Sequence, residues 1–281
     1  MYKNWGQIHT SCIYSIAITR NKEYLFTTDR NGSIKQWNLS YETLEHDWGT
    51  CHSGPIYSII ITSNMKYLIT AGKDQHIKKF SIKDRECVKN FSNAHEDWIL
   101  CMKESIYGEY LFTGSADRHL KQWSLTCDSL YHDYGAIDTY AVTSIAVVRG
   151  DQFIFTGSDD AHLKQWNISQ KKLHKNYKRV HEDCIKTMVA TPDGKFLFTG
   201  SDDKTIKMWD IGEESLFKDF GVVHKDWIRN MHITSDGDYL FSASEDKTLR
   251  QWAIRRKQGL IKDYGEAHLG RVITCISVLP N

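Results

Sequence analysis

The stretch from Thr187 to Asp210, TMVATPDGKFLFTGSDDKTIKMWD, decides the fold of this 281-residue chain. A short apolar run ends at 192–194, where Pro-Asp-Gly favours a turn. The aromatic and β-branched run Phe196–Thr199 is followed by a polar turn and by Ile206–Trp209, where apolar and polar residues alternate. Alternation of this kind is typical of a half-buried strand. A further short run, Leu216–Phe220, completes the unit, which predicts four short strands and no helix.

The same unit recurs along the chain every 43 residues, and four separate positions keep this register. The position before the first strand holds His9, His52, His95, Asp138, His181 and His224, and the position on the second strand holds Thr27, Thr70, Thr113, Thr156, Thr199 and Ser242. The turn between the second and third strands holds Asn31, Asp74, Asp117, Asp160, Asp203 and Asp246. The position on the third strand holds Trp37, Phe80, Trp123, Trp166, Trp209 and Trp252. Four-stranded antiparallel units of ~40–45 residues are typical of β-propeller blades. The repeat therefore predicts an all-β propeller.

These residues resemble the WD-repeat family over essentially the whole chain. In that family the His, the hydroxyl residue, the Asp and the Trp of one blade form a hydrogen-bonded tetrad in which every buried polar group has a partner. The resemblance implies three complete tetrads: His95, Thr113, Asp117 and Trp123; His181, Thr199, Asp203 and Trp209; His224, Ser242, Asp246 and Trp252. Asn31, Phe80 and Asp138 depart from the pattern in the first, second and fourth units. Phe80 leaves Thr70 without an indole donor, so we expect these blades to be less rigid.

The two ends of the chain predict a seventh, incomplete blade. Met1–Gly6 has the pattern of an outer strand, and Val272–Val278 that of an innermost strand. In WD-repeat propellers an N-terminal strand completes the last blade and so removes an exposed sheet edge. The second and third strands are missing, a deficit of roughly 30 residues relative to the repeat. We expect residues 1–281 to be one seven-bladed propeller, truncated in its C-terminal blade; an open ring, a gap filled by another chain, and six blades that close on themselves are the alternatives.

Composition excludes several classes of partner. Lys and Arg total 36 against 35 Asp and Glu, a net charge of +1 that provides no general attraction to nucleic acid or anionic membranes. No apolar run reaches the ~20 residues of a membrane helix, and the N-terminus lacks the apolar core of a secretory signal. Seven Cys without a CxxC pair favour reduced thiols, and hence an intracellular protein, cytoplasmic or nuclear.

No residue pattern indicates catalysis. The phosphate-binding loop, HExxH, GxSxG and kinase motifs are all absent from the sequence, so we expect no enzymatic activity and no cofactor. The chain has thirteen His, of which six occupy repeat positions and are expected to be structural. Cys12 and Cys51 lie near His9 and His52, and the four are ligand types for zinc. Because their spacing is not that of a zinc site, we expect no metal there.

The resemblance also indicates where a partner would bind. In WD-repeat proteins the usual docking surface is the narrow face around the central channel, formed by residues just after the His position and just before the turn Asp. These are Tyr14, Arg30, Tyr57, Lys73, Trp98, Asp159, Lys186, Asp202, Trp227, Arg229 and Glu245. Tyr, Trp and Arg are frequent in interface hot spots. We therefore predict a non-catalytic scaffold or adaptor that binds a peptide or protein segment, within a larger complex.

Charge is distributed unevenly over this predicted surface. Arg30 and Lys73 lie on the first two blades, and Asp159, Asp202 and Glu245 on the fourth to sixth. A surface divided in this way would orient a bound peptide. The two Trp, at 98 and 227, have a second interpretation as caps of the junctions between blades.

A second functional hypothesis concerns the basic stretch 171–179, KKLHKNYKR, on a predicted outer strand. Such a stretch would suit an RNA-binding or ribonucleoprotein component, whose binding would weaken steeply with salt. The structural alternative is that Lys on an exposed edge strand prevents unwanted strand pairing.

Overall fold

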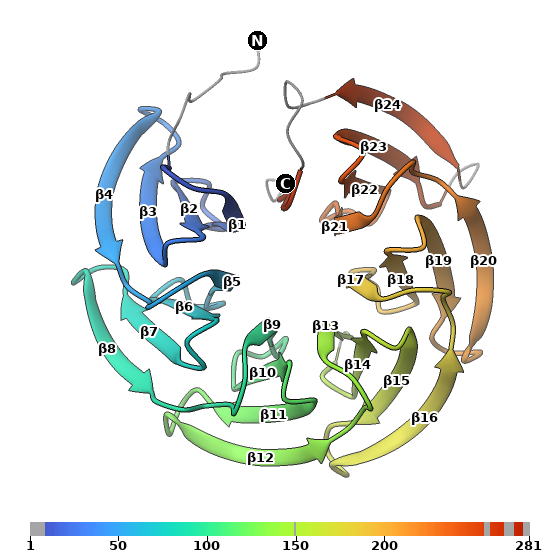
Figure 1. Ribbon diagram of the computed structural model, residues 1–281, viewed down its shortest axis with the longest axis horizontal. Coiled ribbons are helices and arrows are strands. Elements are labelled where there is room, and N and C mark those ends of the chain that lie inside the picture. Colours follow the sequence, from blue (N-terminus) through green and yellow to red (C-terminus); the bar gives the residue numbers. More distant parts are fainter. Residues whose placement is uncertain (1–8, 149, 256–258, 267–272, 278–281) are drawn as a thin grey trace.

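The computed structural model describes residues 9–148, 150–255, 259–266 and 273–277. Within these ranges 24 strands form six four-stranded antiparallel sheets. The sheets are arranged around a central axis as the blades of a propeller, and in each blade the strands follow the chain from the axis outward (Figure 1). The prediction of an all-β propeller is confirmed.

Each blade takes four consecutive strands. Blades 1 to 3 consist of β1 (Ile13–Ile18), β2 (Tyr24–Asp29), β3 (Ser33–Asn38), β4 (Thr43–Thr50), β5 (Ile56–Ile61), β6 (Tyr67–Gly72), β7 (Ile77–Ser81), β8 (Glu86–Phe91), β9 (Ile99–Glu104), β10 (Tyr110–Ser115), β11 (His119–Ser124) and β12 (Ser129–Ala136). Blades 4 to 6 consist of β13 (Val142–Val147), β14 (Phe153–Ser158), β15 (His162–Asn167), β16 (Lys172–Arg179), β17 (Ile185–Ala190), β18 (Phe196–Ser201), β19 (Thr205–Asp210), β20 (Ser215–Val222), β21 (Ile228–Ile233), β22 (Tyr239–Ser244), β23 (Thr248–Ala253) and β24 (Leu260–Glu266).

The turn between the second and third strands has the same backbone conformation in all six blades. Its last residue has a positive φ of 65–79° at Gly32, Gln75, Arg118, Ala161, Lys204 and Lys247. In blade 1 this residue has to be glycine, because a Cβ atom on Gly32 would lie 2.1 Å from the carbonyl oxygen of His52. Because Gly32 has no side chain, the segment that leads into blade 2 at His52 can lie directly against this turn.

The core of the protein lies between the blades rather than within one sheet. Five apolar clusters fill the junctions between successive blades. One repeat position on the second strand contributes to every junction, and its side chains are at most 1% exposed: Phe26, Ile69, Phe112, Phe155 and Phe198. The sixth residue at this position, Phe241, is partly exposed, because no further blade packs against it among the described residues.

The structure corrects the predicted number of blades. It shows six four-stranded blades, and not seven with an incomplete last one. The predicted strand Met1–Gly6 lies outside the described residues. Of the predicted strand Val272–Val278, the described part 273–277 is not assigned as a strand, because it has no ladder partner in the described chain. Figure 1 places this part in a gap between β21 and β1, so the ring of described blades is open there.

Candidate functional site

Each of the three predicted tetrads forms within its own blade, in blades 3, 5 and 6. In blade 3, Asp117 Oδ2 accepts a hydrogen bond from His95 Nδ1 at 2.8 Å, and Thr113 Oγ1 lies 2.7 Å from His95 Nε2. Trp123 Nε1 donates to the same hydroxyl at 2.9 Å. The three contacts recur at 2.7–3.1 Å in the sets His181, Thr199, Asp203, Trp209 and His224, Ser242, Asp246, Trp252. The contacts connect the second and third strands of each blade, the turn between them and the loop that precedes the first strand.

Blade 1 has all four side chains of a tetrad, although Asn31 at its turn position predicted a departure from the pattern. The carboxylate comes from Asp29 and not from the position of Asn31: Asp29 Oδ2 lies 3.0 Å from His9 Nδ1. Thr27 Oγ1 lies 2.7 Å from His9 Nε2 and accepts from Trp37 Nε1 at 3.0 Å. Asp29 ends β2 two residues before the expected turn position, and its other oxygen accepts the backbone N–H of Asn31. The 43-residue register did not predict a carboxylate displaced along the chain in this way.

In blade 2 the indole donor is missing. His52 contacts Asp74 at 2.9 Å and Thr70 at 2.8 Å, but Phe80 stands where the other blades have Trp. The Phe80 ring lies 5.6 Å from the ring of Trp48, edge to face. The equivalent aromatic pair in the next blade, Phe91 and Trp123, has nearly the same separation of 5.5 Å.

Because the two aromatic pairs match, we expect Phe80→Trp to fit and to stabilise the protein by about 1 kcal/mol, the net contribution of one buried hydrogen bond to Thr70. The free energy of unfolding in urea is the measurement. The reverse change in blade 3, Trp123→Phe, is the matched control and is expected to destabilise. A loss of stability in Phe80→Trp would show that blade 2 has no room for the indole.

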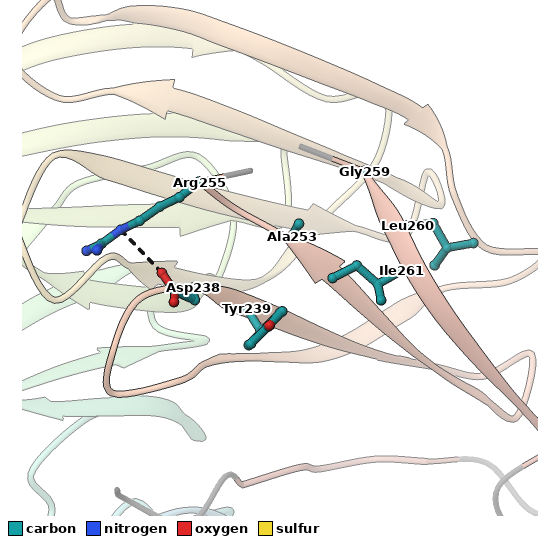
Figure 2. Close-up of a pocket in the computed structure, with 7 residues that line it drawn as sticks. All are labelled: Asp238, Tyr239, Ala253, Arg255, Gly259, Leu260 and Ile261. Carbon is teal, nitrogen blue, oxygen red and sulfur yellow. Dashed lines mark ion pairs between the residues drawn. The ribbon is translucent and has the colours of Figure 1, made fainter. Parts of the chain in front are cut away.

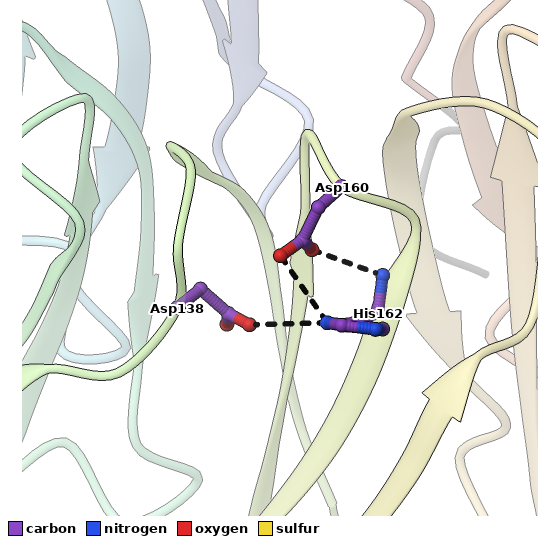
Figure 3. A group of neighbouring side chains, drawn as sticks. All are labelled: Asp138, Asp160 and His162. Carbon is purple, nitrogen blue, oxygen red and sulfur yellow. Dashed lines mark hydrogen bonds and ion pairs between the residues drawn. The ribbon is translucent and has the colours of Figure 1, made fainter.

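Blade 4 replaces the usual His by an acid. Asp138 is buried and its Oδ1 accepts a hydrogen bond from the ammonium of Lys164. His162 Nδ1 lies 3.8 Å from Asp138 and 3.2 Å from Asp160, so the imidazole lies between two carboxylates (Figure 3). Burial raises the pKa of Asp138, and the Lys164 ammonium opposes this rise. The ammonium provides the positive charge that a metal ion would provide, so this group is a structural ion pair.

The four residues considered for zinc do not form a site. His9 and His52 each use both ring nitrogens in the contacts of their own blades. In the described part of the chain, the group with a geometry suited to a metal is Asp138, Asp160 and His162.

A continuous row of aromatic rings crosses blades 1 to 3 at the beginning of their innermost strands β1, β5 and β9. The Tyr14 and Tyr57 rings are 5.4 Å apart, and the Tyr57 and Trp98 rings are 6.1 Å apart. The ammonium of Lys73 lies 4.8 Å from the centre of the Trp98 ring, and Trp98 is 40% exposed. Lys73 and Arg30 form no ion pair with the described residues. The structure therefore brings Tyr14, Tyr57, Trp98 and Lys73 together as an aromatic and cationic surface, which we call the aromatic row. Burial raises the pKa of Tyr57, and the positive charge of Arg30 is close enough to oppose this rise.

Blades 4 to 6 hold the acids that the sequence placed on the same face, together with their own cations. Lys186 Nζ lies 3.7 Å from Asp159 and 3.4 Å from Asp202. Burial raises the pKa of Asp202 to about 6, although Lys186 and Arg229 lower it. These pairs neutralise much of the predicted negative charge on this half of the face.

Blade 6 has a second small group at the beginning of its innermost strand β21. Arg229 forms an ion pair with Glu245, and its guanidinium lies 4.8 Å from the centre of the Trp227 ring. Trp227 is 39% exposed. Because Arg229 is bound to Glu245 and Lys186 to two carboxylates, Arg30 and Lys73 are the predicted surface cations without an ion-pair partner in the described part of the chain.

The basic stretch 171–179 lies on the outer strand β16 and its preceding turn. Most of its charges already have neighbours: Lys171 Nζ lies 4.1 Å from the Tyr131 ring, Lys175 Nζ 3.2 Å from Glu214, and Arg179 3.7 Å from Glu182. These contacts tie the edge of blade 4 to the neighbouring blades. They favour the structural role of this strand over a surface for RNA.

A set of lysines on the third strands was not singled out from the sequence. Each donates to the carbonyl group that precedes the His position of its blade, as Lys78 does to Cys51 at 2.6 Å and Lys207 to Val180 at 2.7 Å. Lys121 and Lys164 make the same contact. All four keep the 43-residue step, which is the signal that would have revealed them.

Comparison with known families gives one match, described as WD domain, G-beta repeat. It covers residues 7–38, 44–81, 85–124, 130–167, 172–210 and 219–253, which is most of the chain. A search of curated proteins found no match. The described residues include no helix that is long and apolar enough to span a membrane.

Proposed function

Since this chain belongs to the WD-repeat family, we propose that it is a non-catalytic scaffold that binds a segment of another protein on its narrow face. Propellers of this family are generally non-catalytic and bind other proteins. The observation that best supports the narrow face is the aromatic row, where the exposed Trp98 continues a line of ring contacts with the half-buried Tyr57 and Tyr14. Large, rigid aromatic side chains of this kind dominate the binding energy of interfaces.

The charges beside the aromatic row indicate what the bound segment contains. Arg30 and Lys73 have no carboxylate partner in the described chain, whereas Lys186 and Arg229 on the other half of the face are paired. A segment with an apolar side chain for the aromatic row and a carboxylate for the two free cations would fit best. The unequal charge would then fix the direction in which the segment lies.

An intracellular location, cytoplasmic or nuclear, is part of the same proposal. All seven Cys are free thiols, and three of them, Cys12, Cys87 and Cys127, are exposed. Exposed free thiols persist where the surroundings are reducing.

Crosslinking mass spectrometry in cell extract identifies the partner and the contact surface together. We expect crosslinks from Lys73 and Lys186 to one partner segment. With that segment purified, Tyr57→Ala and Trp98→Ala are each expected to weaken binding by about tenfold or more, because each removes a hot-spot ring. Tyr41→Ala is the matched control, since Tyr41 is 79% exposed and lies in the turn between β3 and β4, outside the narrow face.

Two results would contradict this assignment. Unchanged affinity in both Tyr57→Ala and Trp98→Ala would exclude the aromatic row as the docking surface. Crosslinks from Lys171, Lys172 and Lys175 to RNA-binding proteins, together with binding that weakens steeply as salt rises, would favour the ribonucleoprotein hypothesis instead.

A further inference from the structure

The gap between blade 6 and blade 1 has two walls of apolar side chains that are covered at every other junction. On the blade 6 wall, Leu249 of β23 is partly exposed. Its counterparts in the other five blades are at most 1% exposed: Ile34, Ile77, Leu120, Leu163 and Ile206. Phe241 of β22 shows the same difference from its own five counterparts, which are also at most 1% exposed.

The blade 1 wall repeats this pattern from the other side. Ile13 of β1 and Leu25 of β2 are partly exposed. The corresponding side chains of blades 2 to 6 are at most 1% exposed: Ile56, Ile99, Val142, Ile185 and Ile228 for the first position, and Leu68, Leu111, Ile154, Leu197 and Leu240 for the second. Both walls therefore have the composition of a junction between blades, but no complete blade of the described residues covers them.

One strand of that neighbour is already in place. Thr274 Oγ1 donates a hydrogen bond to the carbonyl oxygen of Ile13. Between blades 4 and 5 the same contact joins Thr143 Oγ1 to the carbonyl oxygen of Ile185. Ile273, which precedes Thr274, is 5% exposed. Residues 273–277 thus occupy the position of an innermost strand beside blade 1, and their outer edge has no strand paired with it in the described chain.

We propose that the gap between blade 6 and blade 1 is a docking site for a β-hairpin of a partner protein. The hairpin would pair with the free edge of 273–277 and supply second and third strands to a seventh blade. Because both walls are apolar, its two strands need apolar side chains on both faces. This mode of recognition is strand addition to an exposed sheet edge, in which backbone hydrogen bonds provide affinity and side-chain pockets provide specificity.

The occupant has to come from outside the 281 residues. A hairpin of this fold takes 15 residues, as β18 and β19 do over 196–210. The longest segment outside the described residues is eight residues, 1–8. A second copy of the chain offers no spare hairpin, because the strands β1 to β24 are all paired within their own blades.

A hollow on the blade 6 wall suggests one side chain of the hairpin. Tyr239, Ala253 and Ile261 line it, together with Leu260 and the ion pair of Arg255 with Asp238 (Figure 2). In blade 5 the equivalent Phe196 is packed against Phe217, with ring centres 4.9 Å apart. The hollow of blade 6 has only Ile261 at that second position. An aromatic residue of the hairpin would therefore fill it.

The test uses the hairpin that forms the second and third strands of blade 5. The probe is a fluorescent synthetic peptide of residues 196–210, which has apolar side chains on both faces in blade 5. We expect saturable one-to-one binding by fluorescence anisotropy, and slower hydrogen exchange of the backbone amides of 273–277 when the peptide is bound. Leu25→Asp and Phe241→Asp are each expected to weaken binding about tenfold or more, because they place a charge on an apolar wall.

Three controls separate this site from other causes. Leu130→Asp changes an exposed Leu of blade 3 and is expected to leave peptide binding unchanged. A peptide of the same composition in scrambled order is expected not to bind. Tyr57→Ala and Trp98→Ala change the narrow face. They are expected to weaken binding of the protein segment proposed for that face and to leave hairpin binding unchanged.

Several outcomes would overturn the proposal. The absence of both peptide binding and amide protection at 273–277 would exclude strand addition even if the Asp variants fail to fold. Binding that survives both Leu25→Asp and Phe241→Asp would place the peptide elsewhere. A dimer in sedimentation that Phe241→Asp dissolves would make a second copy the occupant. A native chain that continues past residue 281 through two further strands would make the filling intramolecular.

Discussion

Replacing Phe198 by Ala is expected to lower the free energy of unfolding by about 3–5 kcal/mol, the range for a large buried aromatic side chain. Phe198 lies on β18 and is 1% exposed in the cluster between blades 5 and 6, where it packs with Ile206 and Met231. The change removes the apolar contacts of the ring. It also leaves a cavity that rigid sheets on both sides cannot close.

The matched control is Phe241→Ala, at the same repeat position of blade 6. Phe241 faces the gap and is partly exposed, so the same deletion is expected to cost less than half as much. Urea unfolding of both variants, at equal protein concentration, gives the comparison. Equal losses at Phe198 and Phe241 would mean that the gap is closed in solution, because Phe241 would then be as well packed as its counterparts.

Acid is expected to destabilise the protein strongly between pH 7 and pH 4, because protonation of the tetrad side chains favours the unfolded state. Burial lowers the pKa values of His9, His52, His95 and His224. An imidazole with a lower pKa in the folded state takes up its proton first in the unfolded state. The free energy of unfolding therefore falls as the pH drops below about 6.5, the unfolded value.

The tetrad carboxylates extend the same loss to lower pH. Burial alone would raise the pKa of Asp117, but hydrogen bonds from His95 and from backbone N–H groups outweigh it and hold the pKa well below its usual range. Asp203 and Asp246 are lowered in the same way. A carboxylate of this kind contributes stability above its unfolded pKa of about 3.9, and this contribution is lost as the pH falls further.

Urea midpoints at a series of pH values measure this effect. His95→Gln keeps a polar side chain in blade 3 but removes one titrating imidazole, so its stability is expected to vary less between pH 7 and pH 5 than that of the unchanged protein. A free energy of unfolding that stays constant from pH 7 to pH 4 would contradict the argument.

The fold could be predicted from the sequence because its determinants are local and repeated six times. Four strands per unit follow from the turn at Pro192 to Gly194 and the alternation from Ile206 to Trp209, and the alternation recurs in register in all six units. The partners of His95 could be assigned because the family pattern fixes them by spacing. A carboxylate that moves along the chain, as from position 31 to Asp29, keeps the same contact in space but breaks the spacing.

The contents of the narrow face were harder to predict, because they depend on which blades are neighbours. The sequence placed Asp159 and Asp202 on one half of the face but did not show that Lys186 lies between them. It identified Tyr57 and Trp98 as single binding residues and did not show that their rings are in contact. Contacts across a junction join residues about 43 positions apart, and a pattern within one unit does not contain them.

The open ring also has a mechanical consequence. In a closed ring the angles between neighbouring blades must add up to a full turn, so a tilt at one junction has to be compensated at the others. The chain between blade 1 and blade 6 has five packed junctions and no such constraint in its described residues. Small tilts in the same direction at the five junctions then add together. We therefore expect the distance between the two apolar walls to vary more than the distance across any packed junction. A molecule bound between the walls would restrict the tilt at all five junctions together.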